Sequence, residues 1–187
     1  MKTKKNKQTL IRSIESYIPD TETEQKHRKS VLMFLRENNN NFERSNLKGH
    51  ITGSAWLLNK EKTKVLLNYH RKFNKWMQFG GHADGDTDIL AVAIKEAQEE
   101  SGLTNIYPVF STIFDVDVHA IPANLTKTEP AHYHYDVRYL LWTPEREYTI
   151  SKESIDLKWV NINEIRSFVK AESLTRMIDK WEHIINS

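Results

Sequence analysis

The sequence contains no cysteine and has only five prolines and six glycines among its 187 residues. The lack of cysteine excludes a disulfide framework and a thiol nucleophile. Long apolar runs are also missing, because the longest early stretch, residues 31–35, is too short for a signal peptide or a membrane span. We therefore expect a cytoplasmic protein with no membrane partner.

An excess of charge of one sign is absent too, since 27 Lys and Arg residues stand against 25 Asp and Glu residues. The net charge of +2 creates no strong field toward a polyanion or an anionic membrane. The sequence carries no helix-turn-helix or zinc-module pattern, so a nucleic-acid partner is not expected. Its length suits one domain with a proper core plus an appendage.

The N-terminal part has helical periodicity. Apolar residues recur at helical spacing over residues 10–18, and Asp20 or Thr21 can cap a second helix. Four consecutive asparagines at 38–41 then interrupt the pattern. We predict that residues 1–45 form a helical extension that packs on the main domain.

The main domain, residues 46–187, mixes strand and helix patterns. Strands are expected at residues 51–58, 64–69, 109–118, 132–139 and 157–160. Helices are expected at residues 87–101, 165–169 and 174–185. This mixture predicts an α+β fold, an α/β/α sandwich with a mixed sheet.

Three glutamates end the helix that follows the adjacent glycines 80 and 81. Glu96, Glu99 and Glu100 are spaced i, i+3 and i+4, so they lie on one side of that helix. Three like charges repel one another, and a bound divalent cation is the usual reason to keep them. Oxygen ligands favour Mg²⁺ or Mn²⁺. Gly102 is a natural C-cap, and Asp86 or Thr87 a plausible N-cap.

This segment resembles the Nudix box of the Nudix hydrolases, in which a glycine precedes a helix ending in Glu-Glu-any-Gly-apolar. The positions that match the box are Gly81, Glu96, Glu99, Glu100, Gly102 and Leu103. Thr87 replaces the first glutamate of the family, and Lys95 replaces its arginine. Pairing of Lys95 with Asp86 or Asp88 is expected to compensate, although lysine lacks the bidentate fork of arginine.

The resemblance implies a Nudix-type fold and a divalent-metal-dependent hydrolase. Such enzymes cleave a diphosphate linkage in a nucleoside diphosphate linked to another moiety. In this chain the implied Mg²⁺ or Mn²⁺ ligands are the Gly81 carbonyl and the carboxylates of Glu96, Glu99 and Glu100, which are also the implied catalytic residues. The partner would be a small-molecule diphosphate, and a homodimer is a common assembly in the family.

Residues outside the box leave alternatives open. Arg71, Lys72, Trp76 and His82 are candidates for substrate binding, although the two cations are equally well explained as ordinary hairpin charges. The residues considered as the general base are Asp115, Asp117, Glu129 and Asp136. The aromatics considered for stacking on a base are Trp56, Trp76, Tyr133, Tyr135 and Tyr139, all of which also suit a core.

The histidines suggest a second chemistry. His132 and His134 share one face of an expected strand, and with His82 they are candidates for an auxiliary metal site. Ordinary hydrogen bonding is the alternative. Isopentenyl-diphosphate isomerases share the fold, but their chemistry is expected to need a cysteine, which this chain lacks.

A non-enzymatic reading also exists, because some Nudix-like domains bind nucleotides as sensors without cleaving them. Loss of the acid cluster usually accompanies that change. All three box glutamates are present here, which favours the enzyme.

Overall fold

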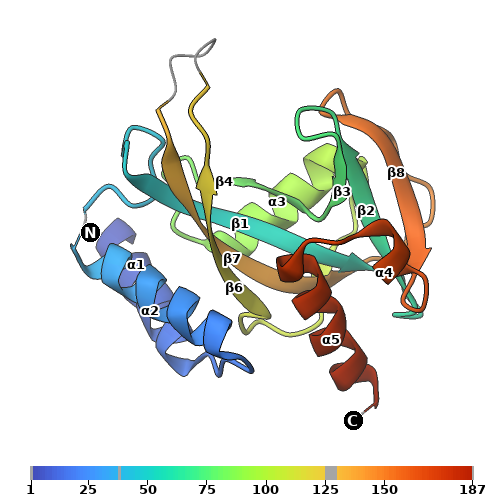
Figure 1. Ribbon diagram of the computed structural model, residues 1–187, viewed down its shortest axis with the longest axis horizontal. Coiled ribbons are helices and arrows are strands. Elements are labelled where there is room, and N and C mark those ends of the chain that lie inside the picture. Colours follow the sequence, from blue (N-terminus) through green and yellow to red (C-terminus); the bar gives the residue numbers. More distant parts are fainter. Residues whose placement is uncertain (1, 38, 125–129, 187) are drawn as a thin grey trace. The chain divides into compact units, whose positions relative to one another are not determined.

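The fold is known from a computed structural model that describes residues 2–37, 39–124 and 130–186 (Figure 1). The helices are α1 (Lys2–Ser16), α2 (Glu22–Glu37), α3 (Ile89–Ser101), α4 (Ile165–Phe168) and α5 (Glu172–Asn186). The strands are β1 (Gly49–Leu58), β2 (Lys64–His70), β3 (Lys75–Met77), β4 (Phe79–His82), β5 (Tyr107–Pro108), β6 (Asp115–Ile121), β7 (His132–Trp142) and β8 (Ser154–Asn161). None of the helices among these residues is long and apolar enough to cross a membrane.

In the described part of the chain, eight strands form one sheet with the order β3-β2-β1-β7-β5. Strand β4 pairs with β1, β6 with β7, and β8 with β2. The strand predicted over residues 109–118 is wrong in its first half, because β6 begins only at Asp115. The chain bends at Ser111 and Thr112, where short polar side chains interrupt the apolar run.

The chain divides into two compact units. The first unit consists of Met1–Gly53, Gly81–Ala93 and Ser111–Tyr139. The second consists of Ser54–Gly80, Ile94–Phe110 and Leu140–Ser187. In the second unit β2 pairs along its length with β8, and the buried rings of Trp56 and Trp181 meet edge to face at 6.2 Å.

In the first unit, α2 begins directly after a predicted cap residue, whereas α1 begins at Lys2, well before the periodic stretch at residues 10–18. Thr21 is the residue that caps α2, since its Oγ1 accepts the Glu24 N–H at 3.2 Å. The buried Glu24 carboxylate in turn accepts the Tyr17 hydroxyl at 2.5 Å and the Asp20 N–H at 3.1 Å. These bonds satisfy donors at the start of α2 and fix the turn between the two helices.

The two helices pack together, and α2 also packs on β6 (Figure 1). Ile14 of α1 and Leu35 of α2 are completely buried, and the Phe34 ring stacks on Tyr135 of β7 at 4.0 Å. The predicted packing of the helices on the rest of the chain is confirmed by these contacts. The division into an extension and a domain at residue 45 stays a prediction.

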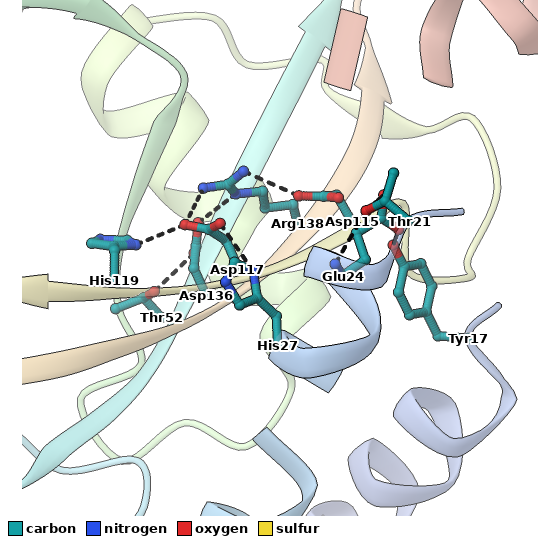
Figure 2. Close-up of polar contacts among 10 residues, drawn as sticks. All are labelled: Tyr17, Thr21, Glu24, His27, Thr52, Asp115, Asp117, His119, Asp136 and Arg138. Carbon is teal, nitrogen blue, oxygen red and sulfur yellow. Dashed lines mark hydrogen bonds and ion pairs between the residues drawn. The ribbon is translucent and has the colours of Figure 1, made fainter. Parts of the chain in front are cut away.

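A buried ion network lies on one face of β6 and β7 (Figure 2). Arg138 is about 2% exposed and contacts three carboxylates that are at most 5% exposed. The distances are 2.8 Å to Asp136, 3.1 Å to Asp115 and 3.1 Å to Asp117. The register pairs Asp115 with Arg138 and Asp117 with Asp136, so strand alternation brings all four side chains to one face.

Neighbouring elements complete this network. The Thr52 hydroxyl of β1 donates to Asp136 at 2.8 Å, and His27 of α2 lies 3.3 Å from Asp117. His119 of β6 lies 3.0 Å from the same Asp117 carboxylate. The three aspartates considered as general base therefore serve an internal arginine, whereas Glu129 lies outside the described residues.

Replacing Arg138 with methionine tests this network, because it leaves three buried carboxylates without their cation. We expect the free energy of unfolding to fall by about 3–5 kcal/mol in urea denaturation. Arg44→Met is the matched control, since it breaks the exposed ion pair with Asp84 and should cost less than about 1 kcal/mol. Equal losses in the two variants would contradict the structural weight given to Arg138.

Candidate functional site

The helix that carries the glutamates begins later than predicted. The first residue of α3 is Ile89, and the Asp88 carboxylate accepts the Ala91 N–H at 3.1 Å. The cap is thus Asp88 and not Asp86 or Thr87; Asp86 instead accepts the N–H of Asp88 at 2.9 Å. Three clustered polar residues compete for this role, and only the one directly before the helix reaches its free N–H groups.

The C-terminus of α3 matches the prediction. Gly102 has a φ of +71°, and its N–H donates to the Gln98 carbonyl at 2.8 Å, as in a left-handed C-cap. A Cβ at this position would lie 2.9 Å from the Thr149 side chain. Glycine is therefore required both for its backbone conformation and for the close approach of Thr149.

Glu100 is the glutamate that α3 turns into the protein interior. Its Oε1 accepts the Gly80 N–H at 3.2 Å, and its Oε2 accepts the Asn68 amide at 2.6 Å. Burial, with a smaller contribution from the nearby Glu96, raises the pKa of Glu100 to about 8 despite the hydrogen bonds from Gly80 and Asn68. A buried carboxylate in this condition favours either a proton or a cation next to it.

The other two glutamates of the cluster lie nearer to solvent. Glu99 is exposed and its Oε1 is 3.6 Å from Lys95 Nζ, while Glu96 is half-buried. Lys95 thus pairs with Glu99 one turn along its own helix, which corrects the expected pairing with Asp86 or Asp88. An i, i+4 pair forms easily because both side chains share one face of the helix.

The α3 carboxylates fit a hard divalent cation in their chemistry. The cluster combines a buried oxygen donor, Glu100, with a half-buried and an exposed one, and all three are anionic oxygen ligands of the kind that Mg²⁺ and Mn²⁺ bind. Among the described residues, however, the side chains whose ligand atoms already lie together are not these glutamates but three histidines, His50, His82 and His134.

The histidines gather in the first unit. The His50 ring lies 4.8 Å from His82, 4.9 Å from His132 and 4.9 Å from His134. His82 and His134 are also 4.9 Å apart. Burial lowers the pKa of His82 to about 4 and that of His134 to about 2, so both rings are neutral at physiological pH.

Sequence reasoning missed two members of these groups. The predicted strand begins at residue 51 and therefore leaves His50 outside it. His50 lies two residues before Thr52, however, and this is the spacing of side chains on one face of a strand. Asn68 was also missed, and its signal is a single polar amide in the otherwise apolar run of β2. A polar residue in a buried strand needs a partner, and here the partner is Glu100.

The remaining substrate candidates lie in the second unit. Arg71 donates from Nε to the Lys152 carbonyl at 3.2 Å and from Nη2 to the Ser154 carbonyl at 2.9 Å, so its guanidinium holds the start of β8. Lys72 places its ammonium 5.2 Å from the Phe73 ring. Trp76 pairs with Tyr69, the neighbour of Asn68, and strand alternation therefore places it on the face opposite the Asn68–Glu100 bond.

The buried state of Glu100 predicts a pH dependence of stability in the presence of a chelator. Between pH 4.5 and about 8 the folded chain holds the Glu100 proton more tightly than the unfolded chain. The free energy of unfolding should therefore fall as pH rises through this window. This titration should contribute roughly 10–20 °C to the decrease in Tm, measured by calorimetry.

Glu100→Gln is the control that removes this titration. The Asn68 Oδ1 has no hydrogen-bond partner among the described residues. A half-turn of the Asn68 amide would let it accept from the new glutamine, which still accepts the Gly80 N–H. The variant should fold and lose that part of the pH dependence; an unchanged slope would contradict the burial of an ionisable Glu100.

No family profile matches the chain. A probable DHNTP pyrophosphohydrolase from Lactococcus lactis subsp. cremoris (strain MG1363) is 29% identical over 133 residues, which are 71% of this chain and 79% of the relative.

Two solved structures share the fold. A Nudix-family hydrolase from Clostridium perfringens has a TM-score of 0.52 at 23% identity and covers 72% of this chain and 97% of that chain. The dihydroneopterin triphosphate pyrophosphohydrolase of E. coli has a TM-score of 0.55 at 15% identity, covering 73% and 96%. The α+β fold class predicted from the sequence is confirmed: the chain has the α/β/α fold of the Nudix hydrolases, and its resemblance to that family is confirmed.

Proposed function

We propose that this chain is a divalent-metal-dependent hydrolase that cleaves a diphosphate linkage in a nucleoside diphosphate linked to another moiety. The observation that carries the proposal is the bond from the Gly80 N–H to the buried Glu100 carboxylate. It ties strand β4, which carries Gly80 and Gly81, to the acid cluster at the end of α3. A Nudix-type site needs these two elements together, and the Lactococcus relative is named as a pyrophosphohydrolase.

The residues of the chain would divide the work. Asn68 and Gly80 hold Glu100 in one orientation, and Glu99 presents a carboxylate at the solvent-exposed side of the helix. Bound Mg²⁺ or Mn²⁺, with Glu96, Glu99, Glu100 and the Gly81 carbonyl as ligands, would supply charge neutralisation of the diphosphate and acidification of the attacking water. Lys95 would balance Glu99 until the cation binds.

The substrate panel follows from the comparisons and from the family resemblance. DHNTP comes first, because the Lactococcus relative carries this substrate in its name. A nucleoside diphosphate sugar, a dinucleotide and a nucleoside triphosphate complete the panel. Release of nucleotide, phosphate or diphosphate is measured with Mg²⁺, with Mn²⁺ and with a chelator.

Glu99→Gln tests the function without disturbing the fold, since Glu99 is exposed. Losing one anionic ligand should lower kcat by about 100-fold or more while Tm stays unchanged. Glu147→Gln, the same change at another exposed glutamate, should keep full activity. Near-normal turnover of Glu99→Gln would refute the metal site on α3.

The sensor alternative gives a different result in the same experiment. A nucleotide-binding domain without catalysis would show no release from any compound, with or without metal, yet its Tm would rise in the presence of its ligand. That combination would replace the proposed hydrolase by a binding protein.

A further inference from the structure

Three neighbouring strands each supply one histidine to a single cluster in the first unit. His50 belongs to β1, and β1 pairs on its two sides with β4, which carries His82, and β7, which carries His134. Adjacent strands lie about 4.8 Å apart, so upright side chains on the two outer strands would be roughly 9–10 Å apart. The rings of His82 and His134 are 4.9 Å apart, so the three rings lean together into a triangle.

The nitrogen positions are those of a coordination site. One ligand atom from each of His50, His82 and His134 lies within 4.8 Å of the others. His132 adds a fourth imidazole, with its Nε2 3.3 Å from His134 Nε2. Two nitrogens bound to one zinc ion at about 2.05 Å and a tetrahedral angle would be roughly 3.3 Å apart.

His132 is also oriented as a metal ligand would be. Its Nδ1 lies 2.9 Å from the Pro130 carbonyl oxygen. A carbonyl only accepts, so the proton is on Nδ1 and the lone pair is on Nε2, which faces His134. Metal-bound histidines typically donate their other ring N–H to a backbone carbonyl in this way.

We infer that His50, His82 and His134, with His132 as the fourth ligand, bind one divalent transition-metal ion of the Zn²⁺ type. Neutral imidazoles favour Zn²⁺ or Co²⁺ over Mg²⁺, which requires oxygen ligands. Four protein ligands make a closed, structural site that joins β1, β4 and β7.

The position of His82 gives the ion a role beyond stability. His82 follows Gly81 directly in β4, so an ion at this site fixes the backbone where the Nudix box begins. That role rests on the proposed function, whereas binding of the ion does not.

The first experiment uses full-length protein without an affinity tag, dialysed against chelator and titrated with Co²⁺. We expect the visible absorption of tetrahedral Co²⁺ to saturate at one equivalent, Zn²⁺ to displace it, and excess Mg²⁺ to leave it unchanged. Zn²⁺ should also raise Tm. Absence of a saturable Co²⁺ spectrum, or its loss in excess Mg²⁺, would overturn the proposal.

Variants locate the site. His50→Asn and His134→Asn should weaken Co²⁺ binding by roughly 100-fold or more. His183→Asn changes an exposed histidine of α5 and should bind as the unmodified chain does. Circular dichroism checks folding, and His82→Asn, at a half-buried position, serves if the buried His50 variant does not fold. Binding that survives in the folded cluster variants would overturn the proposal.

Glu99→Gln separates this site from the proposed hydrolase. The Co²⁺ spectrum should be the same in Glu99→Gln as in the unmodified chain, because the ligands are nitrogens of other elements. A spectrum lost in Glu99→Gln would overturn the histidine site. An inactive protein that still shows the spectrum would refute the hydrolase alone.

Discussion

Burial of the Arg138 guanidinium determines how several elements of the first unit are joined. A buried cation must be paired, and Arg138 meets this demand with carboxylates from its own strand and from β6. Three carboxylates then exceed one cation. The Thr52 hydroxyl of β1 donates to Asp136, and the His27 ring of α2 lies 3.3 Å from Asp117 (Figure 2). The N-terminal helices are thus joined to the sheet by polar contacts as well as by apolar packing.

The side chains on this shared face of β6 and β7 change from charged residues to histidines along the two strands. In the register of β6 and β7, Asp115 faces Arg138, Asp117 faces Asp136, and His119 faces His134. The period of two that places the carboxylates beside the arginine also places the imidazoles beside one another. The carboxylates near Arg138 stabilise the fold because they pair a buried charge. His119 still contacts Asp117 of this network, whereas His50, His82 and His134 bring their ring nitrogens together at the place where we propose a bound ion.

The three glutamates of α3 are equivalent in sequence spacing but not in environment. Glu100 lies inside, where Asn68 and Gly80 satisfy its oxygens and burial raises its pKa. Glu99, one residue earlier, lies in solvent beside Lys95. One helix therefore offers a fixed carboxylate that is bonded to β4 and an exposed one that faces solvent. In the proposed hydrolase both would be ligands of the cation.

The amino-acid sequence alone was enough to predict the box, the helix with its glutamates and Gly102 cap, the main strands and the Nudix resemblance, because each of these depends on residues that are close together along the chain. Only the tertiary structure decided that Glu100 rather than Glu99 is buried, that Asp115, Asp117 and Asp136 serve Arg138, and that His50 joins His82 and His134. Each of these outcomes depends on which strands become neighbours, and strand pairing brings together residues that are far apart in the sequence, such as Thr52 and Asp136, which are 84 positions apart. Local periodicity carries no information about such partners, since it fixes the face on which a side chain lies but not what it meets there.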